Sequence, residues 1–146
     1  MTYTPFSQRD YRWRWKRLGN SWSTIGGYGC YLTSLAMMVN KRPDEVNEIL
    51  KKAGAFDRDL IKQEEAAKAL GLLFLGREYN INKEPKFSPT LKEVDMNRWI
   101  RGKQQHFVLR IIEGGRKAII DPWTGTKQRI DYYNFVSYRL FKQKLP

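Results

Sequence analysis

Hydrophobic positions in the first half of the chain recur with the 3.6-residue period of an α-helix. The positions i, i+3, i+4 and i+7 of one such face are held by Leu32, Leu35, Ala36 and Val39. This spacing predicts a helix over residues 30–40. A second helix is predicted from Pro43, a residue favoured at a first helical position, to a stop at Gly54, and a third between Asp59 and Leu70.

The later part of the chain alternates apolar and polar residues, which is the two-residue period of a half-buried strand. Residues 105–112 and 116–121 predict two strands joined by a hairpin turn at Gly114-Gly115, and residues 129–141 predict one more strand or two. Helices followed by antiparallel strands predict a single α+β domain that spans residues 1–146.

Between these parts lie a short apolar run at 72–75, which predicts a strand, and a polar, proline-bearing loop at 80–89. Thr90 and Glu93 then have the spacing of a capping box, in which two side chains bond reciprocally to backbone N–H groups at a helix start. We therefore expect a fourth helix that begins at Thr90 and ends at Gly102. The residues before Cys30 are polar, aromatic and glycine-rich, which favours an irregular segment.

Composition supports a folded globule. The chain has 146 residues, of which 41% are hydrophobic and 14% aromatic, and these fractions exclude an intrinsically disordered chain. No apolar stretch has the length needed to cross a bilayer, so we expect no membrane span. The first residues lack both the basic and the apolar part of a secretory signal, so we expect none there.

The net charge of +12 indicates attraction to an anionic partner such as nucleic acid, a cell-wall polymer or an anionic membrane. Residues 9–17 interleave cations with aromatic side chains, as proteins that stack on bases do. In the alternative that we favour, the tryptophans pack inward and the cations lie in water, because basic residues are spread along the whole chain.

The chain contains one cysteine and one histidine. One cysteine excludes an internal disulfide, and the pair cannot build a zinc site from thiolate and imidazole ligands. The sequence also lacks a glycine-rich phosphate-binding motif. We therefore expect no metal and no cofactor. Each residue alone has a plain structural interpretation, since a lone cysteine is commonly a small buried hydrophobe.

The sequence around Cys30 favours a catalytic role for this residue. It follows the glycine-rich stretch Gly26-Gly27-Tyr28-Gly29 and begins a predicted helix. Helix N-termini and a neighbouring imidazolium promote ionisation of a thiol, and the glycines permit close approach of a substrate. Cys30 is therefore a candidate nucleophile, and its own amide could donate to an oxyanion.

The candidate base is His106, with Asp121 as the residue that orients it. If the Gly114-Gly115 turn has two residues, Asp121 is the diagonal cross-strand neighbour of His106 on the same face, roughly 7–8 Å away at the backbone. A three-residue loop would put the two side chains on opposite faces of the sheet.

Segments along nearly the whole chain combine into a family pattern. They are, in order, residues 6–13, 18–21, 23–26, 28–30, 33–37, 106–108 and 121–125. Together they resemble the papain-superfamily peptidases related to the bacteriocin-leader-processing enzymes. The resemblance implies Cys30 as nucleophile, His106 as base, Asp121 as orienting residue and Gln8 as oxyanion-hole donor. It also implies a papain-like fold, in which a helical half carrying the cysteine packs on an antiparallel sheet carrying the histidine and aspartate.

We expect a cysteine peptidase that hydrolyses amide bonds of a peptide substrate, and the resemblance implies small residues before the scissile bond. One alternative is a peptidoglycan amide hydrolase of the same mechanism, because a basic surface suits anionic cell walls. Another is a non-catalytic module on this fold that binds polyanions weakly and without specificity.

Overall fold

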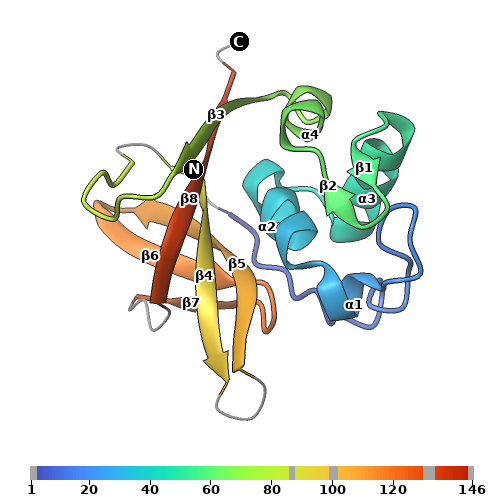
Figure 1. The fold of residues 1–146 in the computed structure, drawn as a ribbon, viewed down its shortest axis with the longest axis horizontal. Helices are drawn as coiled ribbons and strands as arrows, with labels where there is room; N and C mark the ends of the chain where they lie inside the picture. The colour runs from blue at the N-terminus through green and yellow to red at the C-terminus, as the bar shows by residue number, and fades with distance from the viewer. Residues whose placement is uncertain (1–2, 86–87, 99–101, 130–133, 145–146) are drawn as a thin grey trace.

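The computed structural model describes residues 3–85, 88–98, 102–129 and 134–144. Its helices are α1 (Ile25–Tyr28), α2 (Cys30–Val39), α3 (Pro43–Lys52) and α4 (Gln63–Ala69). Its strands are β1 (Phe56–Asp57), β2 (Leu60–Ile61), β3 (Leu72–Glu78), β4 (Thr90–Arg98), β5 (Gly102–Glu113), β6 (Arg116–Asp121), β7 (Thr126–Gln128) and β8 (Asn134–Gln143). A helical part lies beside a sheet (Figure 1), which confirms the predicted α+β class.

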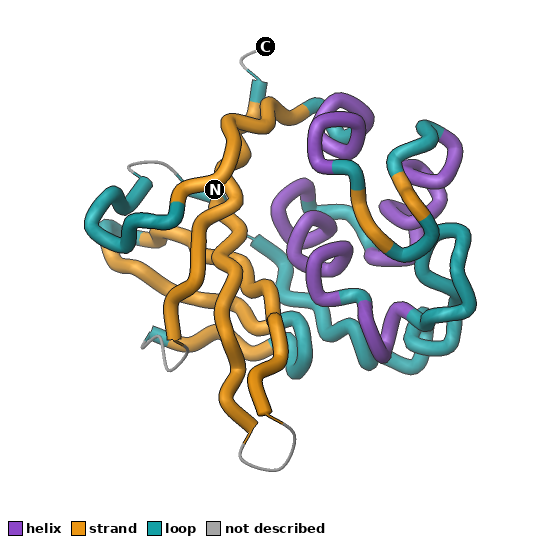
Figure 2. The backbone as a smooth tube through the Cα atoms, in the orientation of Figure 1, coloured by secondary structure: helices purple, strands orange, loops and turns teal. Residues whose placement is uncertain are grey.

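The sheet has six antiparallel strands in the order β3-β8-β4-β5-β6-β7. The short β1–β2 pair belongs to the helical part (Figure 2). Helix α2 lies between the two parts, because it packs against β5 on one side and α3 on another. Its residues from Leu32 to Met38 are all buried, so α2 is the core helix of the protein. No described helix is both long enough and apolar enough to cross a membrane.

The β5–β6 hairpin has the predicted register. Gly114 and Gly115 both adopt positive φ angles, 55° and 76°, which a two-residue turn between right-twisted strands requires and which glycine adopts without strain. Glu113 pairs with Arg116 directly across that turn. This pair fixes the register of the whole hairpin. The register in turn determines on which face of the sheet each side chain of β5 and β6 lies.

The predicted helix from Thr90 to Gly102 is wrong, since Thr90–Arg98 is strand β4 and Gly102 begins β5. The backbone of β4 pairs with β5 on one side and with β8 on the other. Pairing with two strands satisfies its N–H and C=O groups as fully as a helix would, and tertiary context of this kind overrides weak local helix preference. Glu93 takes part in an ion pair with Arg139 instead of capping a helix.

Other predicted elements differ in their limits. The third helix begins at Gln63, because Leu60–Ile61 pairs with Phe56–Asp57 as the small β1–β2 ladder. The strand predicted at 72–75 extends to Glu78, where it pairs with β8. Residues 99–101 of the expected fourth helix and residues 130–133 of the last predicted strand lie outside the described residues.

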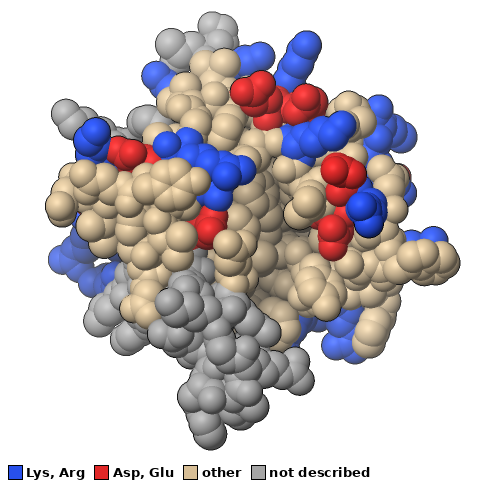
Figure 3. All heavy atoms as spheres, viewed as in Figure 1, with Lys and Arg blue, Asp and Glu red and all other residues tan. Residues whose placement is uncertain are grey.

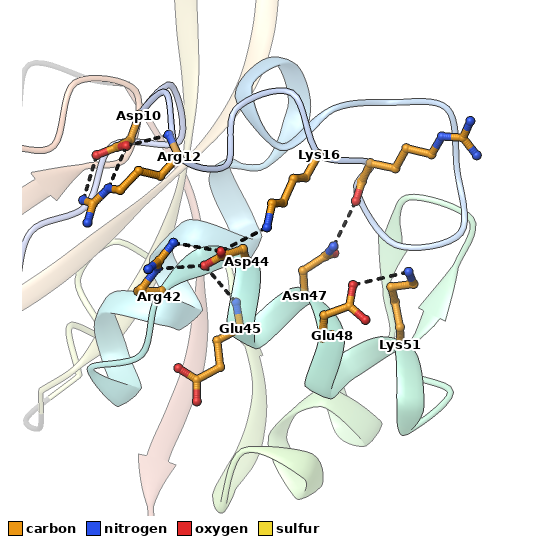
Figure 4. A network of polar contacts seen from close by, with 10 residues as sticks. Asp10, Arg12, Lys16, Arg42, Asp44, Glu45, Asn47, Glu48 and Lys51 are labelled. Atoms are coloured by element: carbon orange, nitrogen blue, oxygen red, sulfur yellow. Dashed lines mark hydrogen bonds and ion pairs between the residues drawn. The ribbon is translucent and has the colours of Figure 1, made fainter.

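The irregular segment before α1 is fastened to α3 by polar contacts (Figure 4). Asn47 is buried on α3, where its Oδ1 accepts from the N–H of Gly19 at 2.9 Å and its Nδ2 donates to the carbonyl of Arg17 at 2.9 Å. Lys16 forms an ion pair with Asp44 at 3.3 Å. The segment thus has a fixed path along the helical part even though it contains little regular structure.

The tryptophans of this segment do not all pack inward as favoured above. Trp13 is fully buried, whereas Trp15 and Trp22 are 74% and 82% exposed. The guanidinium of Arg14 lies 5.1 Å from the ring centroid of Trp15, and that of Arg17 lies 3.6 Å from that of Trp22. These cation–π contacts each cover part of an exposed ring and so reduce the cost of its exposure.

Candidate functional site

A cleft of about 810 Å³ lies between the helical part and the sheet. The space-filling view shows the surface hollowed between these two parts (Figure 3). Gln8, Cys30 and His106 all line the cleft, together with Trp123. Three of the four candidate residues therefore face one shared space, although they come from the N-terminal segment, α2 and β5.

Cys30 is the first residue of α2 and follows directly on α1. The junction depends on Gly29, whose N–H donates to the carbonyl of Ile25 at 2.8 Å. A Cβ at position 29 would lie 2.4 Å from that carbonyl oxygen, so only glycine fits there. The thiol is half-buried, and the N–H of Cys30 is among the first helical N–H groups, which have no acceptor within a helix.

His106 and Asp121 are in direct contact. Nε2 of His106 donates to Oδ1 of Asp121 at 2.7 Å, and both side chains are more than nine-tenths buried. The same carboxylate oxygen accepts from the N–H of Trp123 at 2.9 Å, which fixes its orientation. The contact predicted from the two-residue turn is therefore present, at the point where β6 ends.

Cys30 also acts on His106, because its side chain, like that of Asp121, favours the charged form of the imidazole. Burial lowers the pKa of His106, but the hydrogen bonds and charges of Asp121 and Cys30 outweigh burial and raise that pKa to about 9. The ring is therefore a cation at neutral pH. Because Asp121 takes Nε2, Nδ1 is the ring nitrogen left for another partner. Cys30 and Asp121 thus both act on the one imidazole of His106.

Gln8 reaches the cleft although it stands 22 residues before Cys30. Its backbone N–H donates to the carbonyl of Pro122 at 2.6 Å, and its side-chain Nε2 donates to the carbonyl of Gly26 at 3.2 Å. The side chain is 1% exposed. A primary amide carries two N–H groups, so one is left for a ligand after the bond to Gly26.

The N-terminal segment also holds the turn that carries the aspartate. Ser7 Oγ donates to the carbonyl of Trp123 at 2.9 Å, and the guanidinium of Arg9 lies 4.6 Å from the centroid of the Trp123 ring. Gly125 has a positive φ of 72°, and a Cβ there would lie 3.0 Å from the backbone nitrogen of Ser7. Gln8 and Asp121 are therefore positioned by one and the same contact between distant segments.

Sequence reasoning missed several residues that line the cleft away from the thiol. They include Tyr28, Leu60, Arg77, Glu93 and Arg139. Tyr28 lies in the glycine-rich stretch and could have been found there. Arg77, Glu93 and Arg139 come from strands that pair with segments distant in sequence, so no local pattern marks them.

Within the described ranges, no three side chains of His, Cys, Asp or Glu come together in a way that would hold a metal ion. Comparison of the chain with models of protein families, with curated proteins and with solved structures finds no match. The chemistry of the site therefore has to follow from its own residues.

Iodoacetamide should alkylate Cys30 faster in the folded protein than in denaturant, because the imidazolium of His106 lines the same cleft and assists the thiol. His106 is protonated below its pKa of about 9, so this help is present throughout that range. His106→Ala should slow the reaction there. Mass spectrometry of the intact protein follows the rate without ambiguity, since the chain has one cysteine.

The reaction of the same protein in denaturant supplies the rate of an ordinary thiol. If folded Cys30 reacts only above about pH 8, as an unperturbed thiol does, and His106→Ala changes nothing, the two residues do not act as a pair.

Proposed function

We propose that this protein is a papain-like cysteine peptidase that hydrolyses amide bonds with Cys30, His106 and Asp121. The observation that carries the proposal is the buried hydrogen bond from the imidazole of His106 to the carboxylate of Asp121, with Cys30 and His106 lining the same cleft. A thiol nucleophile needs this arrangement: a base within hydrogen-bond reach, and a third group that orients the base. The fold belongs to the same proposal, with a helical half that carries the thiol and a sheet half that carries the base.

In the first step, the thiolate of Cys30 attacks the amide carbonyl and forms an S–C bond, while the carbonyl electron pair moves onto oxygen. The free N–H of Gln8 Nε2 and the backbone N–H of Cys30 donate to this oxyanion. Such preorganised donors stabilise charge that develops only in the transition state. The N–H of Cys30 lies at the start of α2 with the sulfur, and the side chain of Gln8 is held by Gly26 of the preceding helix α1.

In the second step, His106 gives its proton to the leaving amine, and the C–N bond breaks to leave a thioester on Cys30. Water then attacks the thioester and passes a proton to His106, which releases the acid and restores the resting pair. Asp121 keeps Nε2 protonated throughout, so Nδ1 is the nitrogen that exchanges protons with sulfur and substrate.

The resemblance to the leader-processing peptidases implies small residues, often glycine, before the scissile bond. Peptidoglycan amide hydrolysis uses the same chemistry, and the net charge of +12 suits an anionic wall. Release of new amino groups from purified sacculi, compared with cleavage of a glycine-rich peptide, separates these two substrates.

A glycine-ending peptide aldehyde or vinyl sulfone should form a covalent adduct at Cys30, because both probes capture a thiol that attacks a bound carbonyl analogue. Intact mass gives the adduct, and Cys30→Ser should abolish it. His106→Ala should slow capture of these peptide probes more than it slows alkylation by iodoacetamide, which has no peptide part to bind the cleft. Equal capture by folded and denatured protein would contradict the proposal.

Loss of the Gln8 donor should lower kcat by on the order of 10²–10³, which is typical for one oxyanion-hole donor. Gln8→Glu keeps the buried shape and removes both N–H donors, including the one to the carbonyl of Gly26. Gln8→Ala also leaves the carbonyl of Gly26 without that donor, so a stability loss of about 1 kcal/mol is expected as well.

Rates are compared per folded protein, with thermal melting measured for each variant. Gln128→Ala, which changes an amide on β7 away from the cleft lining, is the matched control. Folded Gln8 variants with unchanged kcat would remove Gln8 from the site.

A second candidate function is weak binding of polyanions by the exposed rings of Trp15 and Trp22. Their stacked partners Arg14 and Arg17 form no ion pair with any described residue, whereas Arg12 and Lys16 are paired with nearby aspartates (Figure 4). An exposed ring beside an unpaired guanidinium offers both stacking and charge to an anionic polymer.

Binding of this kind should weaken steeply as salt rises and depend little on polymer type. Arg14→Ala with Arg17→Ala should reduce the slope of log affinity against log salt by about 1.5, from two lost phosphate contacts. Fluorescence anisotropy with single-stranded DNA and with polyphosphate measures this. Tight, salt-insensitive and sequence-selective binding, unaffected by Cys30→Ala, would favour a binding module over the hydrolase.

A further inference from the structure

Two arginines face each other on the wall of the cleft, away from His106. Arg77 of β3 and Arg139 of β8 are direct partners in the antiparallel register, and both line the cleft. Residues directly opposite share one face of the sheet, with Cβ atoms about 4.5–5.5 Å apart, and like charges in this relation destabilise a sheet. The pair therefore needs compensating negative charge.

Arg139 has its compensation within the protein. It forms an ion pair with Glu93 of β4, in which both side chains are more than nine-tenths buried. Its guanidinium also donates to Ser137 Oγ, and that hydroxyl donates to Glu93 at 3.3 Å. Glu93 and Ser137 are themselves direct partners across β4 and β8. The negative charge of Glu93 thus balances the positive charge of Arg139.

Arg77 has no such compensation. It is exposed on the cleft side and forms no ion pair with the described part of the chain. The neighbouring carboxylate, Glu78, lies on the opposite face of the strand and is 3.8 Å from Lys83. Arg77, Arg139 and Glu93 together therefore carry one more positive charge than negative, and the surplus sits on the exposed member of the pair.

The arginine pair lines the same cleft as Cys30. Tyr31 follows Cys30 directly, and its ring lies 4.6 Å from that of Phe107, while its hydroxyl bonds to Gln63 at 3.1 Å. The charges of Arg139 and Arg77 both act on this hydroxyl and lower its pKa, although burial raises that pKa by more. Tyr31, the neighbour of Cys30 in α2, is therefore within electrostatic reach of both guanidinium groups.

We propose that Arg77, backed by Arg139, forms a substrate subsite that binds a carboxylate of the peptide. The inference rests on the proposed peptidase function and adds a specificity to it. The planar fork of a guanidinium matches a carboxylate with two hydrogen bonds. A bound carboxylate also supplies the negative charge that the opposed arginines lack. The carboxylate comes from an aspartate or glutamate side chain or from a free C-terminus.

A series of peptides tests this subsite. Each peptide has blocked ends, a Gly-Gly cleavage site and one glutamate, whose position moves stepwise along both sides of that site. Each is compared with the matching peptide that has glutamine in place of glutamate. At one position, kcat/KM should be about tenfold higher for glutamate, as for one charge-assisted contact in a cleft. A second arm compares a free C-terminal carboxylate with its amide, which separates the two sources.

Arg77→Ala and Arg77→Glu should bring the glutamate/glutamine ratio near one while the glutamine peptide is still cleaved. The matched control is Arg116→Glu, which reverses an exposed arginine at the hairpin turn outside the cleft lining and should keep the ratio. A wild-type ratio of one at every position, or a ratio that survives Arg77→Ala, overturns the subsite but leaves the peptidase intact.

If no peptide is cleaved and the covalent probes do not label Cys30, the proposed peptidase function itself is contradicted. Binding to the Cys30→Ala variant then decides the subsite separately. Tighter binding of the glutamate peptide that is lost in Arg77→Ala supports it, and equal or absent binding of both peptides overturns it.

Discussion

The site depends above all on the buried hydrogen bond between His106 and Asp121. Burial would leave the imidazole neutral, and only the carboxylate and the nearby thiol keep its pKa above the usual range. The bond exists because the Gly114-Gly115 turn sets the register of β5 against β6. A shift of one residue would turn one side chain to the other face of the sheet. A turn about eight residues away thus determines whether the thiol has a charged partner.

Elements with strong local signals could be predicted from the sequence. Helix α2 was marked by its apolar period, and Cys30 by its place between a glycine-rich stretch and that helix. The β5–β6 register followed from two adjacent glycines, since a two-residue turn fixes which residues face each other. The contact of His106 with Asp121 was therefore a consequence of local chemistry, and it could be inferred without knowledge of the rest of the fold.

Features that depend on distant partners could not be predicted. Thr90 and Glu93 fit a helix start, but β8, which enters the sheet from the end of the chain, makes that segment a central strand. Arg77 and Arg139 face each other only because β3 pairs with β8. The orientation of Trp15 likewise depends on where the segment before α1 lies against α3. Polar contacts determine that position, and a periodic pattern of hydrophobic residues does not reveal them.

The contact between Ser7 and Trp123 joins residues 116 positions apart in the chain. Gln8 is held in place only once this contact forms, whereas Asp121 is already placed by the β5–β6 hairpin, so the site is complete only after both segments have been synthesised and have met. Contacts of such long range form late, because the chain between them must first be ordered. A growing chain that has passed Cys30 but not Trp123 carries an exposed thiol with no organised partner. In this architecture the candidate residues therefore come together only once most of the chain has been synthesised.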